Sequence, residues 1–431
     1  MAPNTTSTSR RGPRGVARHG RLPRRGPVRT LLAVTAGALA VVLVSTVSVA
    51  AIAVRSATSG VQTVTLGNEA DVQDLSIGAI QGGANILLVG SDEREADSQI
   101  DSGVVDGIRN DVNILVHLSQ DHTRVTAVSF PRDLMIDVPA CTGDDGQPHE
   151  ARAYQQFNTV YEEGGMNCTV TAVEQMTGLS IPYAGKITFD GVIEMSNALG
   201  GVEVCVSQPI RDTDSGLDLG AGDHTLQGRD ALAFLRTRHG VGDGSDLARI
   251  SSQQVFLSSM MRKVISGGTL GNVGTLYKLA SAALSNMTLS SSLSSPDSIV
   301  QLGLAMRDLR PEGIVFVQYP VVDDPNQPGR VVASEADAAT LNGLLQTDAD
   351  FTLGDEAEGR GATVDESAPP VETTPPAETS APEAPADPAT PEGGTEPTTP
   401  ATEPAPVTTL PSTVTGQTAA ESTCSQGNSL G

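Results

Sequence analysis

The stretch "VNILVHLSQDHTRVTAVSF", residues 112–130, decides the fold class. It contains two short apolar runs rich in valine, separated by six polar or charged residues. Such runs are typical of strands inside a sheet that is covered on both faces. Similar runs lie at 85–90, 201–206 and 313–321, and helix-like patterns lie at 171–178, 189–200, 246–266 and 296–309. The alternation predicts one α/β domain over residues 81–354, layered α-β-α around a mixed central sheet.

The N-terminal part predicts a membrane anchor. Residues 1–30 carry eight arginines and no acidic residue, and residues 31–54 carry no charge. A helix of 24 residues spans roughly 36 Å, which is enough to cross a bilayer core of about 30 Å. The basic flank predicts a cytoplasmic N-terminus, with everything after a connector at 55–80 outside the membrane. A long cleaved signal peptide is the competing interpretation.

The C-terminal part, residues 355–431, has a different composition. From residue 361 onward it holds 13 prolines, ten acidic residues and no lysine or arginine. Such a sequence does not bury a core, so we expect an extended, disordered tail that acts as a spacer.

Four cysteines lie in the part predicted to be outside the membrane, where disulfides are permitted. Cys141 and Cys168 fall at loop ends, which favours a bond between them, although three pairings exist among Cys141, Cys168 and Cys205. Cys205 lies in a strand-like run and is expected to be a small core residue. Cys424 lies in the tail and is expected to be a free thiol.

Charged pairs border three of the strand-like runs. They are Asp92 with Arg94, Arg109 with Asp111, and Arg132 with Asp133. Ligands of open α/β sheets bind at strand ends. A lone aspartate there is most often a turn or cap residue, but Asp92 and Asp111 border neighbouring strands and can converge on a hard cation such as Mg²⁺.

A second charged stretch, "ALAFLRTRHGVGDGSDLARISSQQ" at 231–254, gathers arginines in a chain whose net charge is −24. Arg236 and Arg238 would share one face of a strand, whereas Arg249 and Gln253 would share one face of a helix, with Asp246 one turn earlier. A flexible glycine-rich loop lies between the two pairs. The arrangement suits a phosphate. A structural salt-bridge network explains the same spacing, and spacing alone leaves both interpretations open.

Taken together, these motifs resemble the LytR–CpsA–Psr family of cell-wall glycopolymer ligases. The matching segments follow the family's order across residues 80–325: "GSDER", "RNDV", "SFPRD", "FNTVYEEGG", "NALGGVEV" and "ALAFLRTRH…DLARISSQQ". The scarcity of lysine and the abundance of arginine, alanine and glycine suit an actinobacterial member.

The resemblance implies a phosphotransferase. It would move a glycopolymer from a polyprenyl-pyrophosphate carrier onto peptidoglycan, with the carrier's lipid in an apolar pocket between sheet and helices. Mg²⁺ (or Mn²⁺) would be held by Asp92 and Asp111. The resemblance assigns the other site residues as follows: Arg109, Arg132, Arg236, Arg238 and Gln253 to the pyrophosphate, Arg94, Asp133 and Arg249 to the catalytic centre, and Asp246 and Asn158 to orienting roles.

Two positions depart from the family pattern. Val112 replaces a threonine next to the metal site, and Gln156 replaces a lysine. A non-catalytic binder of the lipid-linked polymer or of wall glycan is therefore the alternative. A nucleic-acid partner is not expected, because the domain is acidic overall and the basic arm is short.

Overall fold

The computed structural model describes residues 62–67, 82–93, 109–266, 272–354, 357–365 and 407–428. The predicted membrane helix at 31–54, the basic segment at 1–30 and Arg94 lie outside these ranges. No helix within them is both long enough and apolar enough to cross a bilayer.

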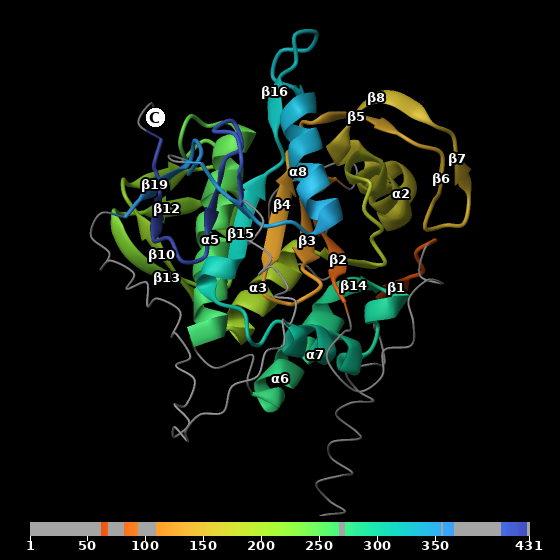
Figure 1. The fold of residues 1–431 in the computed structure, drawn as a ribbon. Helices are drawn as coiled ribbons and strands as arrows, with labels where there is room; N and C mark the ends of the chain where they lie inside the picture. The colour runs from red at the N-terminus through yellow and green to blue at the C-terminus, as the bar shows by residue number, and fades with distance from the viewer. Residues whose placement is uncertain are drawn as a thin grey trace, which may run out of the picture. The chain divides into compact units, whose positions relative to one another are not determined.

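A mixed eight-stranded sheet forms the centre of the domain (Figure 1). The predicted runs at 85–90, 112–118 and 125–130 are three adjacent strands, β2, β3 and β4, paired antiparallel. β9 and β15 extend the sheet in parallel on either side. In spatial order the strands are β1 (Gln62–Val64), β14 (Met287–Ser290), β9 (Tyr183–Ile187), β2 (Ala84–Ser91), β3 (Asn110–Leu118), β4 (Val125–Phe130), β15 (Ile314–Gln318) and β21 (Gly416–Thr418).

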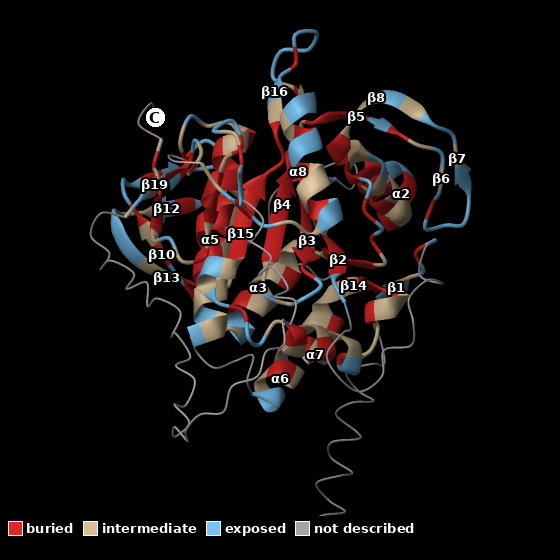
Figure 2. Cartoon of the chain, viewed as in Figure 1, coloured by how far each residue is buried: buried red, intermediate tan, exposed pale blue. Residues whose placement is uncertain are grey.

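Helices cover both faces of this sheet, which confirms the layered α/β prediction. One apolar core joins the sheet to α2 and α8, and a second joins it to α5, α6 and α7. Figure 2 shows the central strands buried between these layers. The helices are α2 (Val160–Thr177), α3 (Phe189–Ala198), α4 (Arg229–Arg236), α5 (Asp246–Ser266), α6 (Val273–Asn286), α7 (Pro296–Ala305) and α8 (Glu335–Thr347), with 3₁₀ turns η2 (Phe157–Thr159), η3 (Ser291–Leu293) and η4 (Pro311–Gly313).

A second, four-stranded sheet packs with α4 and α5 around a third core. Its order is β13 (Gly222–Leu226), β10 (Val202–Val206), β22 (Thr423–Ser425) and β19 (Ala362–Val364). The described residues also form five two-stranded pairs: β5 (Met135–Val138) with β8 (Arg152–Gln156), β6 (Cys141–Thr142) with β7 (Pro148–His149), β11 (Ile210–Asp212) with β12 (Leu217–Leu219), β16 (Val321–Asp323) with β17 (Val331–Ala333), and β18 (Phe351–Thr352) with β20 (Thr408–Thr409).

The expectation of a disordered tail is wrong for residues 357–365 and for residues 407–428. Residues 407–428 are called the C-terminal segment below. β21 adds an antiparallel edge strand to β15, and β22 lies between β10 and β19 in the second sheet. Leu410, Val414 and Ala419 are fully or almost fully buried. The proline-rich composition concealed these strands because their pairing partners lie far away in the sequence.

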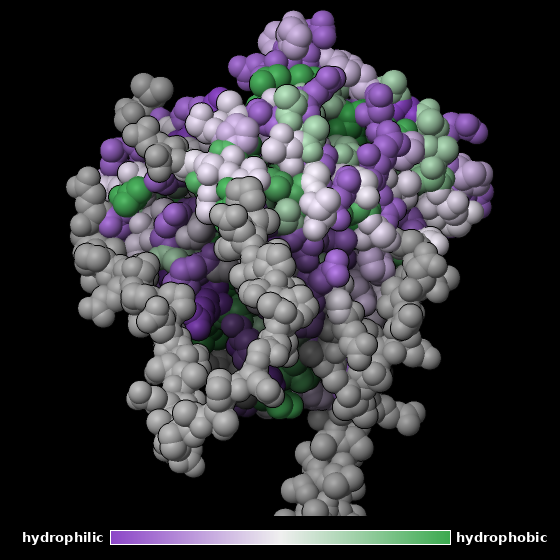
Figure 3. Space-filling view, in the orientation of Figure 1, coloured by the Kyte–Doolittle hydropathy of each residue, from purple (hydrophilic) through white to green (hydrophobic). Residues whose placement is uncertain are grey.

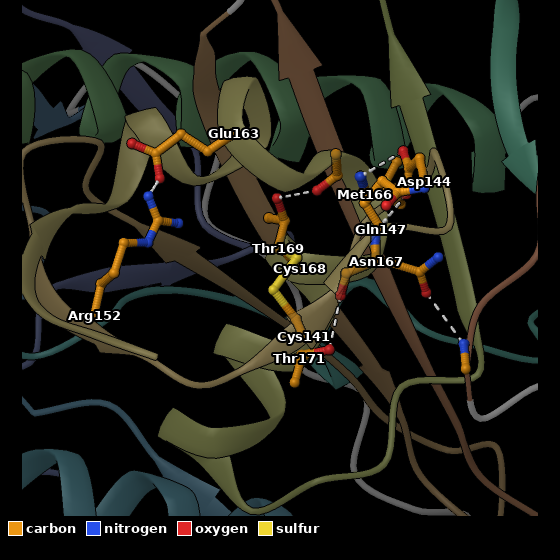
Figure 4. The surroundings of a disulfide bond; sticks show 12 residues. Cys141, Asp144, Gln147, Arg152, Glu163, Met166, Asn167, Cys168, Thr169 and Thr171 are labelled. Atoms are coloured by element: carbon orange, nitrogen blue, oxygen red, sulfur yellow. Dashed lines mark hydrogen bonds and ion pairs between the residues drawn. A yellow bond between two sulfur atoms is a disulfide. The ribbon is translucent and has the colours of Figure 1, made fainter. Parts of the chain in front are cut away.

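Two disulfides hold the domain. The predicted bond between Cys141 and Cys168 is present. It ties the β6–β7 arm to α2, where Asp144 accepts hydrogen bonds from the backbone amides of Met166 and Asn167 (Figure 4). The expectations for the other two cysteines are wrong, because Cys205 and Cys424 form a second disulfide. They lie directly opposite each other on the paired strands β10 and β22.

Candidate active site

The ends of β2 and β3 bring together the two carboxylates predicted to hold a metal. Asp92 Oδ1 accepts a hydrogen bond from the backbone amide of Arg109, 2.8 Å away. Partial burial raises the pKa of Asp92, and the negative charge of Asp111 raises it further. The hydrogen bond from the Arg109 amide acts in the opposite direction but does not cancel the rise. The carboxylates therefore repel each other, and a cation between them would relieve this repulsion.

Arg132 connects these strand ends to helix α5. Its guanidinium lies 2.9 Å from Asp111, 3.5 Å from Asp246 and 3.8 Å from Asp133. Burial opposes its charge, but the three carboxylates together raise its pKa. Arg132 is thus firmly cationic and links Asp111 on the sheet to Asp246 on α5.

The first turns of α5 confirm the predicted helical face. Asp246 and Arg249 form a buried ion pair of 2.6 Å. Arg249 also donates to the backbone carbonyl of Asp111, 2.8 Å away, and the Gln253 amide donates to the carbonyl of Leu235. Asp246 accepts from the backbone amide of Arg132 as well, so its predicted orienting role has a geometric basis.

The prediction that Arg236 and Arg238 share a strand face is wrong. Arg236 is the last residue of α4, and its guanidinium stacks on the Phe189 ring, 4.4 Å from the ring centroid. Arg238 lies in the loop that follows. The helix ends there because Thr237 adopts an extended backbone, with its hydroxyl bound to Asp212 at 2.6 Å.

Arg238 is half-buried, and its buried Nε has no hydrogen-bond partner within the described part of the chain. Burial lowers its pKa, and the positive charges of Arg132 and Arg249 lower it further. The carboxylates of Asp246 and Asp133 act in the opposite direction. An anion beside these guanidinium groups would stabilise the charge of Arg238 further. Arg132, Arg238 and Arg249 are called the arginine cluster below.

The glycine-rich loop that follows Arg238 is held in place by the C-terminal segment. Gly242 donates its amide to the carbonyl of Gln426, and Asn428 bonds through its backbone to Gly240 and through its side chain to the carbonyl of His239. A side chain at Gly242, where φ is +50°, would collide with the backbone of Arg360. The flexible loop expected from the sequence is therefore fastened along its length.

Asp133 and Asn158 lie beside Arg132, because the Asp133 carboxylate is 3.8 Å from its guanidinium and the backbone amide of Asn158 donates to its carbonyl. Asp133 accepts bonds from Gln156 and Arg330 on the same oxygen, Oδ1. Asn158 is 2% exposed, and its Oδ1 has no partner among the described residues. Arg109 is exposed and immediately precedes β3.

These residues and motifs coincide with a known family. The family model LytR_cpsA_psr matches residues 50–346, which is more than half of the chain. The chain belongs to this family. The C-terminal segment lies beyond the matched range.

The chain is also similar to named relatives and to a solved structure. The cell wall biosynthesis protein LcpA of Corynebacterium glutamicum is 28% identical over 281 residues, covering 59% of this chain and 53% of LcpA. The polyisoprenyl-teichoic acid–peptidoglycan teichoic acid transferase TagT of Bacillus subtilis is 28% identical over 245 residues, covering 54% and 70%. A solved LytR-Csp2A-Psr enzyme from Actinomyces oris has a TM-score of 0.49 and 24% identity, covering 66% of this chain and 96% of that one. The match to LcpA spans only about half of the length of that protein.

The two departures from the LytR–CpsA–Psr pattern have different surroundings. Val112 packs into the apolar layer between the sheet and α5–α7, so a hydroxyl at this position would meet apolar neighbours. The Val112 side chain also lies close to Gly90: a Cβ added at Gly90 would be 2.9 Å from the Cβ of Val112. Gln156 instead points toward the charged residues of the site, because its Nε2 donates a hydrogen bond of 2.7 Å to Asp133.

Sequence reasoning missed two charged residues of this LytR–CpsA–Psr site. Asp212 accepts bonds from the Thr237 hydroxyl and the Arg238 backbone amide, and thus fixes the turn that presents Arg238. Arg330, on the β16–β17 hairpin, reaches Asp133 from nearly 200 residues away. Neither residue belongs to a motif with recognisable spacing, because each acts through a contact between distant segments.

Proposed function

We propose that this chain is a phosphotransferase that moves a glycopolymer from a polyprenyl-pyrophosphate carrier onto peptidoglycan. The observation that carries this proposal is the arginine cluster: Arg238 is half-buried, the charges of Arg132 and Arg249 act on it, and its Nε has no hydrogen-bond partner among the residues that the structure describes. A pyrophosphate supplies the negative charge that such a cluster favours. Cluster residues would hold the ligand together with Arg236 and Gln253, while Asp246 fixes Arg249.

An apolar layer next to the cluster would hold the lipid of the carrier. On the sheet face that α5, α6 and α7 cover, many large apolar side chains are only partly buried, including Leu88, Val116, Leu257, Met261 and Leu302. Apolar side chains also reach the surface near α6 and α7 (Figure 3). A prenyl chain placed there would remove this apolar surface from water, which is favourable at about 25 cal/mol per Å².

The chemistry requires little covalent participation by the protein. A hydroxyl oxygen of the acceptor glycan attacks the polymer-side phosphorus and loses its proton. The bond from that phosphorus to the bridging oxygen breaks, and polyprenyl monophosphate leaves with the electron pair of that bond and takes up the proton. Cations held in place neutralise the charge that develops on the phosphoryl oxygens. Asp133 is already engaged by two donors, so its role would be to orient its neighbours.

Asp92 and Asp111 would hold Mg²⁺ or Mn²⁺, which supplies further charge neutralisation when bound. Burial and, to a lesser degree, the charge of Asp111 raise the pKa of Asp92, and a bound cation would offset both effects. We expect chelation with EDTA to abolish transfer. Asp92→Asn should raise the Mg²⁺ concentration needed for half-maximal activity roughly 10-fold or more, in keeping with the effect of disturbing a metal site. An unchanged metal requirement would contradict this assignment.

Residues 31–54 would anchor the protein in the cytoplasmic membrane as a single span, with the N-terminus inside and the folded domain outside. The uncharged run and its arginine-rich flank support this proposal. The two disulfides of the folded domain also suit an oxidising compartment. The partners would then be the lipid-linked glycopolymer, the membrane and peptidoglycan.

The decisive test uses the full chain in detergent or nanodiscs with a pyrophosphate-linked lipid oligosaccharide, an acceptor glycan and Mg²⁺. Arg238→Ala should lower transfer at least about 100-fold, the scale of removing one positioned donor to a developing charge. Arg307→Ala is the matched control, because Arg307 is 60% exposed and pairs only with its neighbour Asp308 in the described structure. Tight lipid binding without transfer by the wild-type chain would favour the non-catalytic binder.

A further inference from the structure

Arg330 lies beside the arginine cluster on an element that contributes no other residue to the site. It immediately precedes β17 of the β16–β17 hairpin, and its NH1 lies 2.6 Å from Asp133 Oδ1. The hairpin also docks through its backbone, because Val331 donates to the carbonyl of Asp133 and bridges to Leu134. The segment that carries Arg132 and Asp133 therefore fixes where Arg330 points.

Asp133 lies between Arg330 and Arg132 of the arginine cluster and contacts both. The carboxylate lies 3.8 Å from Arg132 and is close enough to Arg238 to act on its charge. The guanidinium of Arg330 thus shares a carboxylate with the groups proposed to bind pyrophosphate. It is a further cation at the edge of the same site.

The exposure of the arginines increases across the site. The side chain of Arg249 is 5% exposed, that of Arg132 is 18% exposed and that of Arg330 is 36% exposed. Arg330 also lies on the side of the sheet opposite the proposed lipid layer, since Leu134 and Val331 belong to the core shared with α2 and α8. It is therefore placed toward solvent, where the polymer of a lipid-linked substrate must leave the site.

We propose that Arg330 contacts the polymer-side phosphate of the pyrophosphate-linked substrate. This inference rests on the proposed function and specifies which end of the ligand the β16–β17 hairpin recognises. Asp133 would hold the guanidinium ready for that phosphate. The competing explanation is purely structural: the ion pair with Asp133 would only fasten the hairpin.

Gln156 offers a way to separate these explanations. Its Nε2 lies 2.7 Å from Asp133 Oδ1, the same oxygen that Arg330 contacts, but it belongs to β8 and not to the hairpin. Gln156→Lys would place a positive charge on that oxygen without restoring any bond to the hairpin. It can therefore rescue a lost charge toward the ligand, but it cannot rescue a lost fastening.

The experiment measures the affinity of the full chain in detergent for two probes by calorimetry. One probe is a polyprenyl pyrophosphate that carries a short saccharide, and the other is polyprenyl monophosphate. Arg330→Gln should weaken binding of the first about 10-fold and leave the second within twofold. Adding Gln156→Lys should recover most of the loss, and Arg330→Lys should keep most of the affinity even where Arg330→Gln folds poorly. Arg307→Gln is the matched control.

Two results would overturn the inference. One is an Arg330→Gln chain that binds the saccharide-linked probe as tightly as the wild type. The other is a loss that Gln156→Lys leaves unchanged while both variants melt at the wild-type temperature. These results differ from failure of the proposed function itself, in which the wild-type chain would bind neither probe.

Discussion

The candidate site has two walls that are supported in different ways. The sheet wall consists of Asp92, Asp111 and Arg132, which extend from the ends of adjacent buried strands. The helix wall consists of Arg238, Asp246 and Arg249, and the C-terminal segment holds its loop. The sheet wall is built on strands that follow one another in the sequence, whereas the loop of the helix wall is held both by Asp212 and by residues outside the family-matched range 50–346. A proposed anion site built on the family's fold can therefore also be held by residues of the C-terminal segment, which the family model does not match.

The largest expected effect comes from removing the disulfide behind the helix wall. Cys205→Ser with Cys424→Ser opens a covalent loop of 219 residues. By the chain-entropy relation this should cost about 5 kcal/mol of unfolding free energy, measured by urea denaturation. Affinity for a prenyl pyrophosphate should fall as well, because β22 precedes the residues that hold the Arg238 loop. Unchanged stability would mean that the C-terminal segment holds its position without the bond.

Removing the other disulfide should have a smaller effect. Cys141→Ser with Cys168→Ser opens a loop of only 27 residues, for which the same relation gives about 3.5 kcal/mol. The β6–β7 arm supports neither the arginine cluster nor its loop, so we expect prenyl pyrophosphate affinity to stay within twofold in the fraction that remains folded. A loss of affinity equal to that of the first pair would remove the distinction between the two regions.

Asp212→Asn should weaken the helix wall at its turn. Burial alone would raise the pKa of Asp212. Hydrogen bonds from the Thr237 hydroxyl and from backbone amides, among them that of Arg238, outweigh this effect and lower the pKa. The charge of Asp212 thus stabilises the fold above about pH 4, the ordinary range of an aspartate, and this contribution is lost as the pH falls through the lowered value. We expect a cost of about 2 kcal/mol at pH 7 that shrinks toward pH 2. Guanidinium unfolding at both pH values measures it, and a cost independent of pH would contradict the assignment.

The smallest effect should follow from Asn428→Ala. This change removes the side-chain hydrogen bond to the carbonyl of His239 and leaves the backbone bond to Gly240 intact. It should cost about 1 kcal/mol and weaken prenyl pyrophosphate binding two- to threefold. Thermal melting and calorimetry on the same preparation would show whether stability and affinity fall together, as a support for the Arg238 loop requires.

Much of the sheet wall could be predicted from the sequence, because each of its charges directly borders an apolar run that signals a buried strand. The α5 face could also be predicted, since i,i+3 and i,i+4 spacing brings Asp246, Arg249 and Gln253 together. The turn at Thr237 could not, because the buried carboxylate of Asp212 determines it. The tail was misjudged for a similar reason. Composition measures whether a segment can form a core of its own, whereas β21 and β22 add to sheets that already exist.

The bond between Cys205 and Cys424 also changes what a cut in the chain would do. The proline-, threonine- and glutamate-rich stretch 366–406 joins β19 to β20, and everything after it is covalently linked to β10. A protease that cleaved within this stretch would produce two peptides that migrate as one on a non-reducing gel and as two after reduction. The cleaved protein would keep its C-terminal segment and, with it, the support for Arg238.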